Sequence, residues 1–455
     1  MTHIGNIKRW AAALVCVSLG ILSGPILLAA GAGATARATL APFPASNVDF
    51  TGYGDGPGYG MGQWGAFGYA AVEHETYSWI LNHYYGDGTV LSLSGNIMSK
   101  DPMISVELTE NAGAPVVVES ADPFTVGGIP FLGGRAVRAV LSDGKWDLSA
   151  ALWCRPRHWT PEATGLTNPV AVPSSALSDA TVDQVLTVCE ADGANIAVRG
   201  KVVAYDAPSG AVTLNVLPAE EYVRSVISAE VSWSWGLYGG TTAAPQAQPW
   251  GFQALEVQAV ATRSYLAAEI AAGGWAPYAT TCDSVCQSYP GMATEVGILT
   301  QAAADTAGQI VELAGTPATA TAPASPATPV FTQYSASTGG YTSADSPFPA
   351  VPDVGDSVCI QGPYFTCNPC HEWYAVVPVA AIESAFPSVG TLAAVTVTER
   401  AGPATLPFGG RALTIEIEGT SGTVVTTSGD ALGALLAGNN PDYCSSNWYG
   451  VTNGP

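Results

Sequence analysis

The sequence is poor in charge, and above all in positive charge. Only 11% of its 455 residues are charged, and 15 basic residues against 37 acidic ones give a formal net charge of −22. So acidic a chain is a poor partner for nucleic acid or anionic lipid, since both are polyanions. The surface must then consist mainly of Ser, Thr, Gly, Gln and Asn. Such a surface suits an exported protein that contacts carbohydrate.

Common catalytic and cofactor patterns are also missing. The chain contains neither an HExxH motif nor a nucleophile elbow. Residues 367–371 read Cys-Asn-Pro-Cys-His, which fits the haem-attachment pattern. A haem needs a second axial ligand, however, and the mature chain has few His and Met residues to supply one. Pro369 and the nearby Cys359 and Cys444 favour a disulfide-knotted loop, so we expect no cofactor.

A zinc site built on Cys282 and Cys286 is a further alternative. No histidine lies between His158 and His371 to complete it. In an exported chain a Cys-x3-Cys pattern is more often a tight disulfide. We therefore expect no metal.

Long apolar runs are absent except at the N-terminus. Lys8 and Arg9 precede an apolar stretch from Trp10 to Ala30, and small residues follow. This pattern predicts a signal peptide over residues 1–38, then a tether over 39–47. An uncleaved anchor is the alternative, because the run approaches the roughly 18 residues that span a bilayer. Either way we expect a secreted or cell-wall-associated protein.

Export gives the cysteines a role. Cys16 lies in the signal region, which leaves an even number that suggests disulfides. Sequence order favours two local pairs and leaves the last four cysteines to pair among themselves: Cys154–Cys189, Cys282–Cys286, and Cys359, Cys367, Cys370 and Cys444.

The order of patterns predicts an α+β protein with a helical core around a glutamate-bearing helix. Residues 48–102 are glycine- and aromatic-rich, with a helix expected over Tyr69–Tyr85. Residues 103–216 carry short β-branched runs that predict a β-rich subdomain. A core over 217–372 follows, with a strand expected at Val330–Tyr334, a disordered excursion at 315–329, and a small α/β piece at 373–455. The β-branched runs are Ile104–Leu108, Val116–Val118, Ala136–Leu141, Val182–Val188, Ile196–Tyr205 and Val212–Val216.

Glu230 lies where the helical pattern calls for an apolar residue. Across residues 217–231 (LPAEEYVRSVISAEV), Tyr222, Val223, Val226 and Ile227 recur at helical spacing. Glu230 follows Ile227 by three residues and Val226 by four, so it falls in this apolar stripe. A carboxyl among apolar groups has a raised pKa and can donate a proton near neutral pH. The alternative is that the helix ends earlier and Glu230 turns out to solvent.

A second helix, from about Gly251 to Ala272, is apolar almost all round and is expected to be buried on most sides. Its polar residues therefore need partners. For Glu256 and Glu269 we favour a structural role in internal salt bridges. Arg263 is the better functional candidate, as a cationic donor directed into a site.

Two neighbouring motifs carry a resemblance to a known family. Residues 226–230 read VISAE, and residues 254–265 read ALEVQAVATRSY. They resemble V-x-P-A-E-M and A-L-K-A-Q-A-V-A-A-R-T-Y, the core signature of the stage II sporulation protein D / amidase-enhancer (SpoIID/LytB) family. Further stretches are similar to family motifs in the same order: GYGDGPGYGMGQWG at 52–65, LPAEEYV at 217–223, CDSVCQSYPG at 282–291 and YSASTGGYT at 334–342.

The resemblance implies a lytic transglycosylase that acts on peptidoglycan glycan strands. The family's catalytic glutamate matches Glu230, and its helix arginine matches Arg263. A muramidase would need a second carboxylate, for which Asp283 or Asp55 could serve. Within the matching motifs, the predicted substrate-binding residues are Arg263, Gln258, Gln63, Trp64, Gln287, Tyr334, Ser337 and Thr338.

The chain also departs from the family pattern. Tyr53 and Pro57 stand where the glycine motif carries histidines, Ser228 replaces the proline before the glutamate, and the Cys282–Cys286 loop is one residue shorter. The rival hypothesis is a non-catalytic peptidoglycan-binding or amidase-enhancing protein. We expect a monomer whose partners are glycan strands and a cell-wall amidase.

Overall fold

The computed structural model describes residues 40–86, 88–174, 180–241, 247–316, 324–344 and 348–454. These residues form two compact units, each discontinuous in sequence. Unit 1 combines residues 40–58, 336–343 and 369–454, and unit 2 combines residues 59–335 and 344–368. The expected signal peptide lies outside the described residues. Of the expected tether, only residue 39 is outside them, and its last residue, Asn47, begins strand β1.

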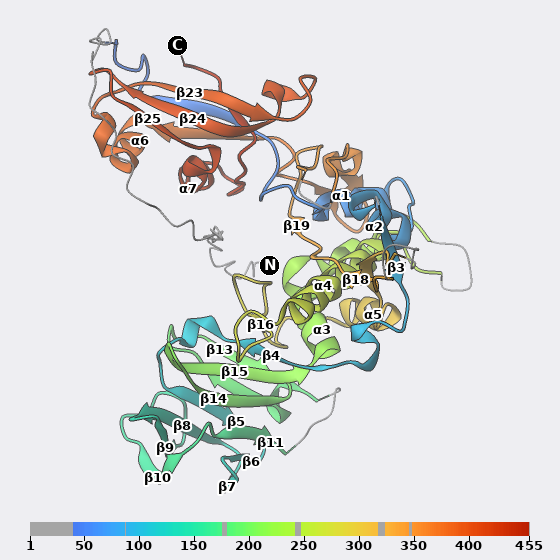
Figure 1. Ribbon diagram of the computed structural model, residues 1–455, viewed down its shortest axis with the longest axis vertical. Helices are drawn as coiled ribbons and strands as arrows, with labels where there is room; N and C mark the ends of the chain where they lie inside the picture. Colours follow the sequence, from blue (N-terminus) through green and yellow to red (C-terminus); the bar gives the residue numbers. More distant parts are fainter. Residues whose placement is uncertain are drawn as a thin grey trace. The chain divides into compact units, whose positions relative to one another are not determined.

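Unit 1 is built on two three-stranded sheets. Strand β1 (Asn47–Gly52) lies between β22 (Trp373–Pro378) and β26 (Tyr449–Val451), so the two ends of the described chain share one sheet (Figure 1). The second sheet has the order β23 (Leu392–Ala401), β24 (Arg411–Gly419), β25 (Val424–Ser428), with helices α6 (Val379–Ala385) and α7 (Gly433–Gly438) nearby. The two sheets share the hydrophobic core of unit 1, whose fully buried residues include Phe50, Ile415 and Tyr449.

The β-rich part of unit 2 consists of two sheets that share one hydrophobic core, which includes Val118, Trp146 and Val202. The six-stranded sheet has the order β10 (Thr160–Leu166), β9 (Lys145–Ala151), β8 (Arg135–Ser142), β5 (Val116–Ser120), β12 (Leu186–Cys189), β13 (Asn195–Val198). The seven-stranded sheet has the order β16 (Thr281–Cys282), β4 (Met103–Glu107), β15 (Gly210–Pro218), β14 (Lys201–Ala207), β11 (Val170–Pro173), β6 (Phe124–Val126), β7 (Ile129–Phe131).

The helical part of unit 2 surrounds α4 (Phe252–Ala272), most of whose residues are buried. Its neighbours are α1 (Gln63–Ala71), α2 (Tyr77–Tyr85), α3 (Ala219–Glu230) and α5 (Gly297–Asp305) (Figure 1). Short strands complete the unit: β3 (Thr89–Ser92), β17 (Ile310–Leu313) and β18 (Thr328–Pro329) form one sheet, β2 (Met61–Gly62) pairs with β19 (Tyr334–Ser335), and β20 (Cys359–Gln361) pairs with β21 (Phe365–Cys367).

Helix α3 follows directly from β15, and its sequence explains both its start and its buried face. Pro218 precedes the first turn, where Glu220 and Glu221 meet the positive end of the helix dipole. Tyr222 and Val226 are fully buried. This confirms the helix predicted from the apolar spacing, and the helix extends to Glu230 itself.

The eight cysteines after residue 40 form four disulfides: Cys154–Cys189, Cys282–Cys286, Cys359–Cys367 and Cys370–Cys444. The expected pairs are confirmed, and the haem-like motif has no free thiol because its two cysteines belong to different disulfides. The zinc alternative at Cys282 fails for the same reason.

Four sequence expectations differ from the structure. The run 182–188 is not one strand, because residues 182–184 form a 3-10 turn and β12 begins at Leu186. The helix expected over 69–85 is two helices, α1 and α2, with residues 72–76 between them. The strand expected at 330–334 is not continuous, because β18 ends at Pro329 and β19 begins at Tyr334. The run 196–205 makes two strands, because a turn at Arg199 and Gly200 separates β13 from β14, with Gly200 in the left-handed region.

Candidate active site around Glu230

Glu230 is the last residue of α3, and the next residue, Val231, is extended. Its side chain is part-buried. The carbonyl end of a helix carries a partial negative charge, which disfavours a carboxylate placed there. The residue therefore sits where its neutral, protonated form is favoured.

Neutral hydrogen-bond donors hold the Glu230 carboxyl. The backbone N–H of Ser288 donates to Oε1 at 3.1 Å, and Gln63 Nε2 donates to Oε2 at 3.3 Å. The Tyr334 hydroxyl forms a further hydrogen bond to this carboxyl, which competes for the single hydroxyl proton with Gln287 Oε1, 3.0 Å away. The three donors come from α1, the loop after β16 and β19, so tertiary folding assembles the site from distant segments.

Two opposing effects set the proton affinity of Glu230. Burial raises the pKa of this carboxyl above its ordinary value of 4.5, while the hydrogen bonds from Ser288, Gln63 and Tyr334 lower it. Burial is the larger effect, so the net direction is upward. A carboxyl with a raised pKa can act as a general acid, and its donors also stabilise the carboxylate left after the proton has gone.

A buried layer of amides supports these donors. Gln63 Nε2 also donates to Gln258 Oε1 at 3.2 Å, and Gln258 Nε2 donates to the Thr262 hydroxyl at 3.3 Å. Gln287 accepts from the Tyr334 hydroxyl at 3.0 Å. Gln258 and Gln287 are both buried, so they can position Gln63 and Tyr334 but are not exposed to a ligand.

Trp64 connects the site to an aromatic cluster. Its ring lies 4.9 Å from that of Trp235 and 6.0 Å from that of Phe67, between centroids. Trp64 is part-exposed and adjacent in sequence to Gln63. Of the residues predicted to bind substrate, Gln63 and Tyr334 contact the Glu230 carboxyl, and Trp64 lies in the aromatic cluster next to Gln63 in the sequence.

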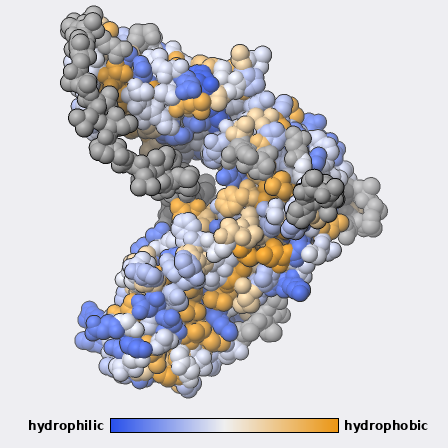
Figure 2. Space-filling model, viewed as in Figure 1, coloured by the Kyte–Doolittle hydropathy of each residue, from blue (hydrophilic) through white to orange (hydrophobic). Residues whose placement is uncertain are grey.

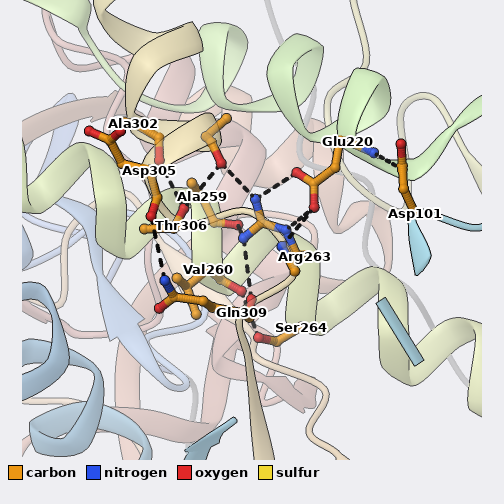
Figure 3. A network of polar contacts seen from close by, with 12 residues as sticks. Asp101, Glu220, Ala259, Val260, Arg263, Ser264, Ala302, Asp305, Thr306 and Gln309 are labelled. Atoms are coloured by element: carbon orange, nitrogen blue, oxygen red, sulfur yellow. Dashed lines mark hydrogen bonds and ion pairs between the residues drawn. The ribbon is translucent and has the colours of Figure 1, made fainter. Parts of the chain in front are cut away.

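The Arg263 side chain does not point into the Glu230 site, as the sequence predicted it would, but pairs with Glu220. Its Nε and Nη2 each donate to Glu220 at 2.8 Å, and its remaining donors reach the carbonyls of Ala259, Ala303 and Gln309 (Figure 3). The side chain is completely buried. The prediction of a cationic donor directed into the site is wrong, because Arg263 is the centre of a closed ion-pair network that joins α3, α4 and α5.

The predicted salt bridges of Glu256 and Glu269 are not formed within the described residues. Glu256 accepts from Gln253 Nε2 at 2.6 Å, and burial raises its pKa to about 8. Burial likewise raises the pKa of Glu269 to about 7. Both carboxyls are therefore buried without a cationic partner.

Ser337 and Thr338 belong to unit 1 and are completely buried. Their hydroxyls accept hydrogen bonds from the backbone N–H groups of Gly339 and Gly340. The expectation of a sugar-binding loop is not supported here, because these hydroxyls shape a glycine turn in which both glycines have positive φ. Tyr53, at one of the family's histidine positions, also lies in unit 1 and donates to Glu372 at 3.2 Å.

The carboxylates considered for a hydrolytic mechanism have other partners. Asp283 Oδ1 accepts from both the backbone N–H and the hydroxyl of Thr109, at 3.0 and 2.6 Å. Asp55 lies in unit 1 and accepts from the backbone of Ser445 at 2.9 Å.

Sequence reasoning did not identify the Ser288 N–H as a donor to Glu230. A backbone donor has no signature of its own in a sequence. The available signal was the short spacing of Cys282 and Cys286, whose disulfide constrains the loop just before Ser288. The Glu220 partner of Arg263 was also missed, because a glutamate in a first helical turn is already explained by the helix dipole.

Within the described residues, no helix is both long and apolar enough to cross a membrane. The four disulfides fit an oxidising, extracytoplasmic environment. Residues 208–312 match a family model described as SpoIID, stage II sporulation protein. Neither the curated proteins nor the solved structures gave a match to the chain. The matched region contains all of α3 and α4, and with them Glu230, Gln258 and Ser288.

Proposed function

The chain belongs to the stage II sporulation protein (SpoIID) family through residues 208–312, and we propose that it is a lytic transglycosylase of peptidoglycan. The substrate is the glycan strand, and the cleaved bond joins N-acetylmuramic acid to N-acetylglucosamine. The enzyme acts outside the cytoplasm, either secreted or associated with the cell wall. A cell-wall amidase is its proposed partner, because such an enzyme removes the peptides from the same strands.

Glu230 acts first as the acid. Its protonated carboxyl donates to the glycosidic oxygen as the bond to the muramic acid C1 breaks, and an oxocarbenium-like state forms. The resulting carboxylate then takes the proton from the C6 hydroxyl of the same sugar as that oxygen bonds to C1. The 1,6-anhydro ring closes, Glu230 regains its proton, and no water is consumed.

The observation that carries this proposal is the surroundings of the Glu230 carboxyl. Burial and the helix end favour the protonated acid, while the hydrogen bonds from Ser288 and Gln63 support the carboxylate. A single group can therefore serve both proton transfers. A hydrolase would usually need a second carboxyl about 5–10 Å away, and Asp283 is held by Thr109 instead.

The test is digestion of purified peptidoglycan, and of glycan strands freed of peptide, with products identified by mass spectrometry. The native chain is expected to yield anhydro-muramyl ends. Glu230→Gln, which removes the transferable proton with little change in shape, is expected to lower their rate by a factor of about 10² or more. Glu256→Gln is the matched control, because it makes the same change at another buried glutamate, and its rate should stay close to native.

Two outcomes would contradict the proposal. Water-added reducing ends that depend on Glu230 would identify a muramidase. No products from either substrate, together with retained binding to glycan, would identify the non-catalytic peptidoglycan-binding or amidase-enhancing protein.

A further inference from the structure

The basic residues of this acidic chain are unevenly distributed. Twelve of the 15 Lys and Arg residues follow residue 40, and five of those twelve lie between residues 135 and 157. The same stretch contains only two acidic residues, Asp143 and Asp147. Local charge here is therefore opposite in sign to that of the whole chain. The five residues are Arg135, Arg138, Lys145, Arg155 and Arg157.

These cations also differ from the others in their partners. Arg199, Arg224 and Arg263 each form ion pairs with glutamates. Among the described residues, no carboxylate forms an ion pair with any cation of the 135–157 stretch. Their charge is thus not neutralised by a carboxylate within the described structure, and an external anion can supply the missing negative charge.

The centre of this region is the loop from Leu152 to Trp159, which we call the basic loop. It connects β9 to β10, next to the edge of the six-stranded sheet. The disulfide Cys154–Cys189 ties it to β12, and the Arg155 guanidinium donates to Asn195 Oδ1 and to the carbonyls of Glu190 and Ala194, each at 3.1 Å. The loop is therefore fixed to the sheet at two consecutive residues.

Two aromatic rings flank two cations along the basic loop. Residues 153, 155, 157 and 159 are Trp, Arg, Arg and Trp. Trp153 is 56% exposed and Arg157 is exposed, while the guanidinium of Arg138 lies over the Trp159 ring at 4.7 Å from its centroid. The Nε atom of Arg138 is buried without a hydrogen-bond partner. Figure 2 shows strongly hydrophilic residues beside apolar ones over the region where Figure 1 places β8, β9 and β10.

We propose that the basic loop and Arg138 bind a linear polymer of sugars or polyols joined by phosphodiesters. A guanidinium makes paired hydrogen bonds to phosphate oxygens, and the flat apolar face of a Trp ring packs on the C–H groups of a sugar ring or of a polyol chain. A polymer in which neutral units flank charged links matches the order Trp, Arg, Arg, Trp at alternate positions of the loop. This inference does not depend on the activity proposed for Glu230.

Charge distinguishes this ligand from an anionic membrane. A flat anionic surface would also approach exposed acidic residues of the neighbouring segments, Asp143, Asp147 and Glu162, and would repel those within the screening length of about 8 Å at physiological salt. A flexible strand can contact the basic loop alone. The observations therefore favour a soluble or wall-attached strand over a lipid surface.

The test is binding of the full, disulfide-bonded chain to soluble poly(glycerol phosphate) at several salt concentrations. Affinity is expected to fall as salt rises, because each neutralised phosphate releases a counterion. Arg157→Glu should weaken binding several-fold and reduce the slope of log affinity against log salt by about 1. Arg157→Lys should keep the slope. Trp153→Ala should weaken binding and leave the slope unchanged.

Lys201→Glu is the matched control, because it makes the same change of charge at an exposed residue of β14, and it should bind like the native chain. Thermal unfolding of each variant establishes that it is folded. Equal binding to neutral dextran or to polygalacturonate, tighter binding to oligothymidylate, or an Arg157→Glu variant that binds as tightly as the native chain would overturn the proposal.

Discussion

At the scale of single residues, Glu230 owes its chemistry to its position at the end of α3 and to the donors that reach it. Ser288 contributes a backbone N–H and Gln63 a side-chain amide. The amide of Gln63 is shared between Glu230 and the buried Gln258. Gln63 is therefore the side chain through which the pKa of Glu230 can be changed without altering the carboxyl itself.

Gln63→Met is expected to shift the pH dependence of cleavage. The lost hydrogen bond stabilised the carboxylate, so the pKa of Glu230 rises and the alkaline limb of the activity profile moves to higher pH. Gln258 loses a partner as well, which should cost about 1–3 kcal/mol of stability. The measurement is the pH profile of anhydro-product formation, with Glu256→Gln as the control. An alkaline limb that stays in place would show that Glu230 is not the group that titrates.

At the scale of elements, Arg263 fastens α4 to α3 and α5. It pairs with Glu220 through two hydrogen bonds and reaches the carbonyls of Ala303 and Gln309. Glu220 also accepts from the backbone N–H of Gly308 at 3.0 Å. This network holds together the helices that position Glu230, and it explains why an arginine belongs in an otherwise apolar helix.

Arg263→Met is expected to lower the free energy of unfolding by about 3–5 kcal/mol, because Glu220 loses its cation in a mostly buried place. Lys201→Met is the control, because Lys201 is an exposed residue of β14 and its replacement should change stability by about 0.5 kcal/mol or less. Denaturant unfolding measures both changes. A loss of glycan affinity by Arg263→Met without a loss of stability would instead restore the substrate-binding role that the sequence suggested.

At the scale of the whole molecule, buried carboxyls without cationic partners link stability to pH. Burial raises the pKa of Glu256 to about 8 and those of Glu190 and Glu269 to about 7. In the unfolded chain these glutamates lose their protons near the ordinary pKa of 4.5. In the folded chain they keep them up to about pH 7 or 8. The unfolded state then binds fewer protons than the folded state, so stability falls as pH rises through this window.

We expect the free energy of unfolding to decrease by a few kcal/mol, in order of magnitude, between about pH 5 and about pH 8. Glu256→Gln should reduce this decrease, because it removes one of the raised pKa values. Replacement of the exposed Glu162 by Gln should leave the pH-dependent decrease in stability unchanged. Denaturant titrations across this pH range measure the effect, and stability that increases towards pH 8 would contradict it.

The sequence by itself determined helices α3 and α4 and two of the disulfides, and it identified Glu230 as the candidate catalytic residue. Helical spacing placed α3 and α4, because an apolar stripe can be read locally, and cysteine order suggested the pairs Cys154–Cys189 and Cys282–Cys286. Both kinds of inference rest on neighbours in the chain.

The tertiary structure alone decided which groups contact each other across long sequence separations. In the folded chain Arg263 pairs with Glu220, and the Ser288 N–H donates to Glu230. Ser337 and Thr338 fold as part of unit 1. The tertiary structure also joined β1 to β22 and β26, at the two ends of the described chain. Long-range pairing depends on the packing of all the elements together, so no local pattern of residues specifies it.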